Sequence, residues 1–162
     1  MKKKTLCRQV LSSPTHFLAF GFGAGLAPIG PGTFGTLVAI PIYLLMQPLS
    51  LGGYLLLVAL ISLFGIWLCG ASATKLGLKD PGGIVWDEIA GFLVTMTLAP
   101  QGWQWIAIGF VFFRIFDIWK PWPILRIDQQ VEGGLGIMLD DIIAGLYALI
   151  VLQVLAYTMP NL

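Results

Sequence analysis

Seven charged side chains lie at the ends of apolar stretches, and their types suit the binding of a metal ion and a phosphate. They are five carboxylates and two cations: Asp87, Glu88, Asp117, Asp140, Asp141, Arg114 and Lys120. Carboxylates grouped at one depth of a membrane would repel one another, and a divalent cation would relieve that repulsion. Oxygen ligands favour Mg²⁺, whereas zinc would require His or Cys. The chain has one His and two separated Cys, so we predict that the five carboxylates bind Mg²⁺.

The stretch 112–123, FFRIFDIWKPWP, places Arg114, Asp117 and Lys120 at successive steps of three. On a helix these residues share about a third of the circumference, and the two prolines that follow end the helix. Ionisable groups at such a membrane position are functional candidates by default. The alternative is a charged cluster that only anchors the helix end at the membrane interface.

The pairs Asp87-Glu88 and Asp140-Asp141 each open an apolar stretch. Acidic residues in the first turn of a helix are stabilised by its dipole, so helix capping is the alternative to a catalytic role. A similar five-residue sequence occurs at both pairs, DEIAG at 87–91 and DIIAG at 141–145. A glycine one turn after the aspartate predicts that another helix approaches closely there.

A glycine-rich segment, APIGPGTFGT at 27–36, precedes the first apolar helix. Backbone N–H groups and threonine hydroxyls at a helix start can hold phosphate oxygens, although the Gly-Lys-[Ser/Thr] ending of a P-loop is missing. The alternative to phosphate binding by this segment is a plain membrane turn. For His16, the alternative to a role in the site is a position at the membrane interface. The predicted substrate-binding set is Arg114, Lys120, Thr33, Thr36, Gly32, Gly35 and His16.

Membrane helices must position these residues, because only 10% of the chain is charged and 57% is hydrophobic. We predict an all-α polytopic membrane bundle, a single domain over residues 1–162, with about five spans at 34–48, 54–73, 84–99, 103–119 and 140–158. Residues 16–33 are too rich in Gly and Pro for a regular span and predict an interfacial or re-entrant segment. Residues 120–139 are predicted to be the longest polar loop. The net charge of +1 gives no reason to expect nucleic acid.

The basic residues divide the loops into two classes. The N-terminus and the loops 74–83 and 120–139 hold every Lys and Arg except Arg114, while the turns near 50 and 101 hold none. The excess of Lys and Arg in cytoplasmic loops predicts that the basic loops face the cytoplasm. All the carboxylates then lie on the cytoplasmic side.

Four long motifs occur in order: GFGAGLAPIGPGTFGT, GGIVWDEIAG, FRIFDIWKPWP and GGLGIMLDDIIAG. Through them the chain resembles bacterial phosphatidylglycerophosphatase A over nearly its whole length. The resemblance implies a multi-pass enzyme of the bacterial inner membrane that uses Mg²⁺ to dephosphorylate phosphatidylglycerophosphate to phosphatidylglycerol. It also implies that the acidic positions of the family are the five carboxylates named above.

Phosphoryl transfer needs charge neutralisation and one group that orients the nucleophile, with little covalent chemistry from the protein. We therefore expect Arg114 and Lys120 to bind the phosphate, and Asp87, Asp117 and Asp141 to be catalytic as well as metal ligands. Which of them acts as base, and whether water or an aspartate attacks phosphorus, stays open.

Two other functions remain as alternatives. The first is another metal-dependent lipid-head-group enzyme, such as a phosphotransferase, although the Asp-Gly-x-x-Ala-Arg string of alcohol phosphotransferases is absent. The second is a cation-coupled transporter, which should carry charge in the middle of its spans. Here nearly all charge lies at the span ends on one side.

Overall fold

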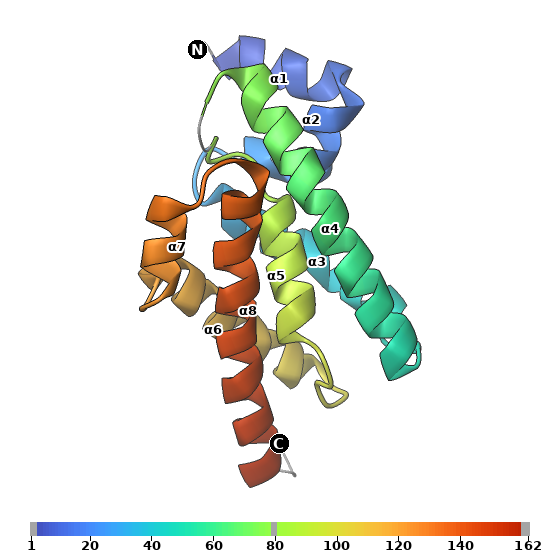
Figure 1. Ribbon diagram of the computed structural model, residues 1–162. Coiled ribbons are helices and arrows are strands. Elements are labelled where there is room, and N and C mark those ends of the chain that lie inside the picture. The colour runs from blue at the N-terminus through green and yellow to red at the C-terminus, as the bar shows by residue number, and fades with distance from the viewer. Residues whose placement is uncertain (1–2, 79–80, 160–162) are drawn as a thin grey trace.

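The computed structural model describes residues 3–78 and 81–159, and this part of the chain consists of helices joined by turns and short irregular stretches, with no strand. The all-α prediction is therefore confirmed (Figure 1). The elements in chain order are α1 (Lys3–Ser12), α2 (Pro14–Ala19), the 3₁₀ segment η1 (Gly21–Leu26), α3 (Pro31–Met46), α4 (Leu51–Leu76), α5 (Trp86–Thr95), α6 (Trp103–Trp119), α7 (Ile124–Gln130) and α8 (Gly133–Thr158).

The short helix α5 lies at the centre of the bundle and packs against α3, α4, α6 and α8 (Figure 1). Most of its side chains are buried, among them Ile89, Phe92 and Leu93. Its ten residues extend about 15 Å, half the roughly 30 Å of a bilayer's hydrocarbon core. The apolar stretch 84–99 is thus a core helix covered largely by protein, and it ends four residues earlier than predicted.

Two helices of the described chain, α4 and α8, are long and apolar enough to cross a membrane by themselves. This is fewer than the five spans predicted. Helix α4 also exposes a row of large apolar side chains, including Leu56, Leu60, Leu63 and Trp67. A broad exposed apolar surface of this kind is typical of a helix that contacts lipid or another protein.

Helix α8 begins at Gly133, seven residues before the predicted start, so the prediction of a polar loop over 120–139 is wrong. Part of that stretch forms α7, and two glycines in the first turn of α8 permit close packing against other parts of the chain. A Cβ on Gly134 would collide with the carbonyl oxygen of Ile66, and one on Gly136 with that of Val131. Asp140 and Asp141 consequently lie two turns inside α8, which excludes helix capping as their role.

The glycines of the two similar sequences, Gly91 and Gly145, lie in the contact between α5 and α8. A Cβ on Gly91 would lie 2.6 Å from the carbonyl oxygen of Asp141, and one on Gly145 would collide with the carbonyl oxygen of Gly91. The Thr95 hydroxyl of α5 donates to the Gly145 carbonyl of α8 at 3.4 Å across the same contact. The predicted close approach is confirmed, and it brings the start of α5 beside Asp141.

Residues 16–33 form no spanning helix, as predicted. They contain the end of α2, the η1 segment with Phe22 and Gly23 in the left-handed region, and the start of α3 after a left-handed Gly30. Protein covers part of the segment, because Gly21 and Gly25 are buried and the Val85 N–H donates to the Ala19 carbonyl at 2.9 Å, whereas Ile29 is 83% exposed. The irregular backbone therefore directs the first turn of α3 toward the start of α5.

Candidate functional site

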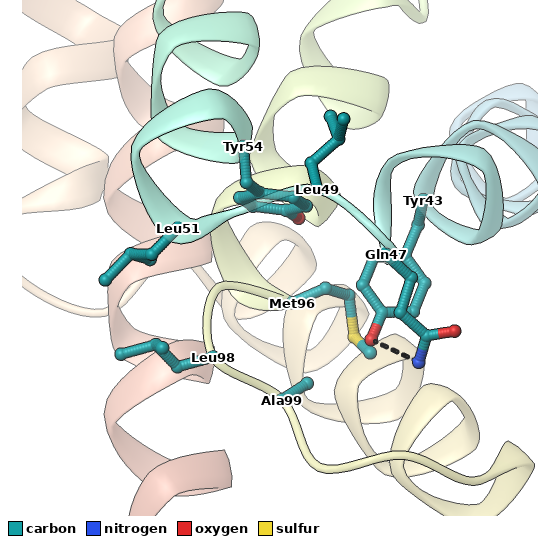
Figure 2. A pocket seen from close by; sticks show the side chains of 8 residues that line it. All are labelled: Tyr43, Gln47, Leu49, Leu51, Tyr54, Met96, Leu98 and Ala99. Carbon is teal, nitrogen blue, oxygen red and sulfur yellow. Dashed lines mark hydrogen bonds between the residues drawn. The ribbon is translucent and has the colours of Figure 1, made fainter.

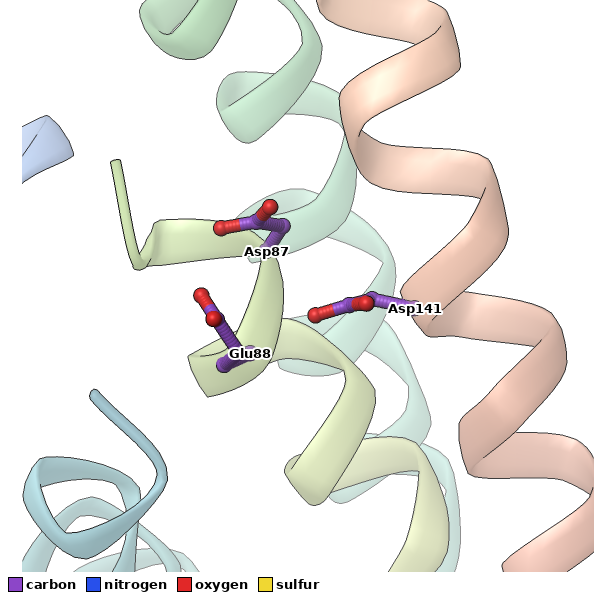
Figure 3. A group of neighbouring side chains, drawn as sticks. All are labelled: Asp87, Glu88 and Asp141. Atoms are coloured by element: carbon purple, nitrogen blue, oxygen red, sulfur yellow. The ribbon is translucent and has the colours of Figure 1, made fainter. Parts of the chain in front are cut away.

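Three carboxylates from α5 and α8 form the centre of the site. Asp87 and Glu88 occupy the first turn of α5, and Asp141 projects toward them from α8 (Figure 3). One oxygen of each carboxylate lies within 4.8 Å of the others. Three carboxylate oxygens at this spacing, contributed by two helices that are packed tightly together, match the oxygen ligands that hard cations prefer.

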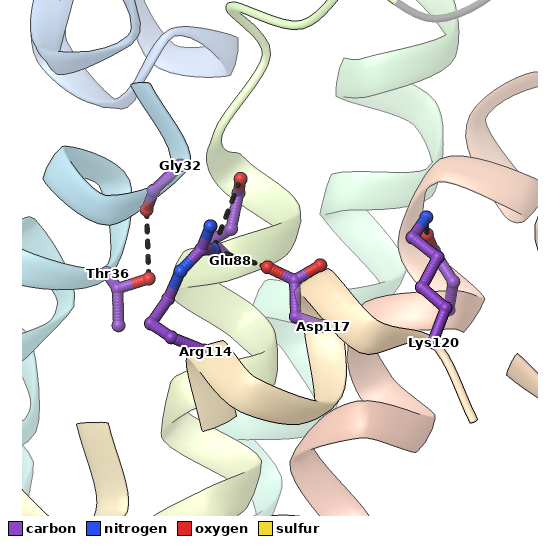
Figure 4. Close-up of polar contacts among 7 residues, drawn as sticks. Gly32, Thr36, Glu88, Arg114, Asp117 and Lys120 are labelled. Carbon is purple, nitrogen blue, oxygen red and sulfur yellow. Dashed lines mark hydrogen bonds and ion pairs between the residues drawn. The ribbon is translucent and has the colours of Figure 1, made fainter. Parts of the chain in front are cut away.

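Helix α6 adds Arg114 and Asp117 to this centre. The Nη1 of Arg114 forms an ion pair with Asp117 and lies 3.7 Å from the Oε1 of Glu88 (Figure 4). The Asp117 carboxyl is also within hydrogen-bonding reach of the Asp141 carboxyl. The predicted face of α6 thus points into the bundle, and the arrangement joins α5, α6 and α8 through their charges.

Lys120 connects a second acidic pair at the rim of the site. It follows the last residue of α6, and its Nζ lies 2.6 Å from Asp140 and 3.0 Å from Asp128. Burial alone lowers the pKa of Lys120, but its hydrogen bonds and attraction to Asp140 and Asp128 outweigh burial and raise the pKa above its usual value. Lys120 therefore stays charged and ties α6 to α7 and α8.

Five buried side-chain polar atoms in the described part of the chain have no hydrogen-bond partner, and all five belong to this site. They are Asp87 Oδ1, Glu88 Oε2, Asp140 Oδ1, Asp141 Oδ2 and Arg114 Nε. Leaving a buried polar group unsatisfied costs about 1–3 kcal/mol, and more for a charged group. The four oxygens fit the donor set of Mg²⁺, and the Arg114 N–H fits an anionic oxygen.

The start of α3 forms one wall of the site. A Cβ on Gly32 would collide with Glu88 Oε1 and lie 3.0 Å from Arg114 Nη1, so only glycine leaves this space open. Gly35 packs one turn further on against Val85. The Thr36 hydroxyl donates to the Gly32 carbonyl at 2.9 Å (Figure 4), and the Thr33 N–H donates to Gly30 at 3.0 Å. Of the glycine-rich segment, Gly32 lies nearest the charged centre.

His16 lies elsewhere, in the contact between α2 and α4. Its Nδ1 is 2.8 Å from the hydroxyl of Ser72, and burial together with the nearby charge of Lys75 lowers its pKa. This contact accounts for the buried imidazole without a ligand. A role for His16 in substrate binding stays a prediction.

Residues 17–156 match the sequence model of the phosphatidylglycerophosphatase A family. The chain belongs to this family. A phosphatidylglycerophosphatase A of Escherichia coli is 49% identical over 154 residues, which cover 94% of this chain and 90% of that protein. The protein of the same name in Haemophilus influenzae is 42% identical over 151 residues, covering 92% and 93% of the two chains.

A more distant relative, from Bacteroides thetaiotaomicron, carries the provisional name phosphatidylinositol-3-phosphatase. It is 37% identical over 142 residues, which cover 83% of this chain and 88% of that protein. No solved structure matches this chain at a significant level. The match to the phosphatidylglycerophosphatase A family includes all seven charged residues of the site and excludes α1.

Sequence reasoning missed one charged residue that the fold brings to the site, Asp128. It lies in α7, a two-turn helix inside the stretch predicted to be a loop. The spacing of Asp128 from Lys120 carries no signal unless α7 is known to fold back. The available clue was the pair of prolines after Lys120, which reverses the chain direction.

Proposed function

We propose that this chain is a membrane-embedded, Mg²⁺-dependent phosphatase that removes the terminal phosphate of phosphatidylglycerophosphate to leave phosphatidylglycerol. The proposal rests on membership of the phosphatidylglycerophosphatase A family and on the names of its two nearer relatives reported above. The structural observation that carries it is the concentration of unpartnered buried polar atoms in one group of carboxylates beside an arginine.

Asp87, Glu88 and Asp141 are the residues that would hold the cation, since their oxygens already face one another. When bound, Mg²⁺ supplies positive charge that offsets the phosphate oxygens and the leaving alkoxide. The unpartnered Nε of Arg114 binds a phosphate oxygen, because the Nη1 is already engaged with Asp117 and Glu88. Arg114 thereby fixes the phosphate against the same wall as the metal ligands.

Asp117 is the carboxylate best placed to orient the attacking group. Its position is set by the ion pair with Arg114, and it is within reach of Asp141. Hydrolysis forms a new bond from a water oxygen to phosphorus and breaks the bond between phosphorus and the glycerol oxygen. A carboxylate takes a proton from the water, and that proton is returned to the glycerol oxygen, which becomes the hydroxyl of phosphatidylglycerol. Lys120 keeps Asp140 in place through their 2.6 Å contact and so holds the rim of the site.

We propose that α3, α5 and α6 complete the membrane domain around α4 and α8 and that the site faces the cytoplasm. The N-terminal helices lie at one end of the molecule, and the α3–α4 turn, the α5–α6 turn and the C-terminus lie at the other (Figure 1). This arrangement agrees with the division between basic and uncharged loops, because cytoplasmic loops are rich in Lys and Arg.

Cysteine accessibility tests this orientation. In a variant with Ser in place of the exposed Cys7, a cysteine at Gly52 should react with a membrane-impermeant thiol reagent in intact cells, and one at Gln130 should not. The buried Cys69 supplies the background signal. Labelling at Gln130 without cell lysis would reverse the assignment.

Phosphate release by the purified protein tests the activity. Phosphatidylglycerophosphate should be hydrolysed with Mg²⁺, and excess chelator should abolish the reaction reversibly. Phosphatidylinositol 3-phosphate serves as the competing substrate, because of the name of the Bacteroides relative. Faster hydrolysis of phosphatidylinositol 3-phosphate would show that the enzyme prefers a different head group. Full activity in excess chelator would show that the reaction does not depend on a metal ion.

A further inference from the structure

A shallow apolar groove of about 470 Å³ runs along the outer face of α6. Its lining consists of Phe110, Val111, Arg114, Ile115, Ile118 and Trp119. The apolar side chains are well exposed for their size, with 51% of Val111 and 70% of Ile118 accessible. The groove is therefore an open surface with room for an apolar ligand, and it is separate from the carboxylates on the inner side of α6.

Arg114 belongs both to this groove and to the charged site. It is the one charged residue of the lining, and its Nη1 pairs with Asp117 and approaches Glu88. Its Nε is buried and has no partner. The groove surface is almost wholly apolar, so Arg114 lines it with the aliphatic part of its side chain, while the guanidinium lies on the carboxylate side against Asp117 and Glu88. The groove therefore adjoins the charged site at Arg114.

We propose that this groove holds an acyl chain of the lipid substrate while the phosphate of the same molecule lies against Arg114. The proposal rests on the proposed function and names where that substrate enters, from the side of the bundle across α6. A phospholipid has an apolar chain covalently joined to an anionic phosphate, and the structure places an apolar groove and a cationic group next to each other at one residue, Arg114. A second copy of the protein would cover the apolar residues but would leave the buried Arg114 donor without an anion.

The groove then acts as a specificity determinant. Its apolar contacts are available to a long-chain lipid and unavailable to a short-chain, water-soluble analogue, whereas the phosphate contacts are common to both. Filling the groove should therefore weaken use of the long-chain lipid alone, and the loss should lie mainly in KM because the contact is made equally in the ground and transition states.

The test compares dioleoyl phosphatidylglycerophosphate in detergent micelles with its dihexanoyl analogue, using Val111→Trp and Ile115→Trp. We expect kcat/KM for the dioleoyl lipid to fall by about tenfold or more, through KM, with the dihexanoyl value within about twofold of wild type. Retained dihexanoyl hydrolysis also shows that the variants fold. Leu60→Trp is the matched control, since Leu60 is a half-exposed apolar residue of α4 outside the groove, and it should change neither value.

Three results would overturn the proposal. One is an unchanged dioleoyl reaction in both tryptophan variants. Another is an equal loss on both lipids, and an accompanying change in oligomeric state would make the groove an interface between copies. The third is the absence of phosphate release by the wild-type protein from either lipid, which removes the proposed function itself and so is distinct from a failure of the groove alone.

Discussion

The two ends of the bundle differ in whether their buried polar side chains have hydrogen-bond partners. The end opposite the carboxylates contains a cavity of about 150 Å³ near Tyr43, Gln47 and Tyr54 (Figure 2). There the Tyr54 hydroxyl donates to the Leu93 carbonyl at 2.6 Å, and the Gln47 amide contacts the Tyr43 hydroxyl at 3.5 Å. Each of these polar side chains has a partner from the protein itself.

The carboxylate end contains all the unpartnered buried side-chain atoms found in the described ranges. Helix α5 contributes to both ends, since its first turn carries Asp87 and Glu88 and the cavity at the other end is lined by Met96, which follows its last residue. The difference in hydrogen bonding therefore does not come from a difference in secondary structure. Satisfied polar groups stabilise a fold, whereas buried unsatisfied ones destabilise it and persist where function requires them. The comparison assigns ligand binding to the carboxylate end and a structural role to the tyrosine end.

Asp141→Asn should produce the largest effect on activity. Asparagine keeps the shape of the side chain but removes a proposed metal ligand, so we expect turnover to fall by about a hundredfold or more, in the range that a single catalytic group contributes. Stability measured in chelator should not decrease, because one source of repulsion among the buried carboxylates is lost. Steady-state kinetics and thermal unfolding report the two quantities.

Glu132→Gln is the control for this change. Glu132 is an exposed acidic residue just before α8 and outside the carboxylate group. It should retain most of the wild-type activity. If Asp141→Asn behaved like Glu132→Gln, the carboxylate end would lose its assigned role.

Gly145→Ala tests whether the close contact of α5 and α8 positions the site. The added Cβ would collide with the Gly91 carbonyl, so the two helices must separate. We expect a loss of about 1–3 kcal/mol in unfolding free energy, as for other overpacked cores, together with lower turnover because Asp141 lies one turn away.

Gly52→Ala is the matched change at a glycine of α4 whose Cβ would meet no atom within 4 Å. It should be neutral or stabilise the protein by up to about 1 kcal/mol, with normal turnover. Equal behaviour of the two alanine variants would show that the α5–α8 contact tolerates the extra atom.

Tyr54→Phe should have the smallest effect, and only on stability. It removes the donor to the Leu93 carbonyl, so the free energy of unfolding should fall by about 0.5–1.5 kcal/mol, the net value of a typical hydrogen bond. Turnover should stay unchanged, because the hydroxyl lies at the end opposite the carboxylates. A large loss of turnover in a folded Tyr54→Phe protein would contradict the structural role of that end.

The sequence predicted which residues form the site better than it predicted the helices that position them. Asp87, Asp117 and Asp141 were expected together because charge is rare in this chain and lies at the ends of apolar stretches, and the fold places them together. The start of α8 was missed because the glycines at 133–136 suggest flexibility, whereas Gly134 and Gly136 pack closely against the carbonyls of Ile66 and Val131. Sequence hydrophobicity does not distinguish a helix covered by protein from one covered by lipid, which explains the error in the length of α5.

The outer groove on α6 was also beyond sequence reasoning. Its residues are an ordinary apolar run, and only the packed structure shows that Arg114 joins the groove to the carboxylates. Asp128 was missed for a similar reason, because its contact with Lys120 depends on the fold of α7.

Thermal unfolding in a Mg²⁺ titration, without substrate, tests most directly whether the carboxylate end binds a cation. A ligand that binds only the folded state stabilises it by about 2.7 kcal/mol at a hundred times its Kd. We expect Mg²⁺ to raise the unfolding temperature of the wild-type protein in a saturable way, and to leave that of Asp141→Asn almost unchanged. Equal stabilisation of both proteins, or no stabilisation of the wild type, would contradict the assignment of Asp87, Glu88 and Asp141 as a metal site.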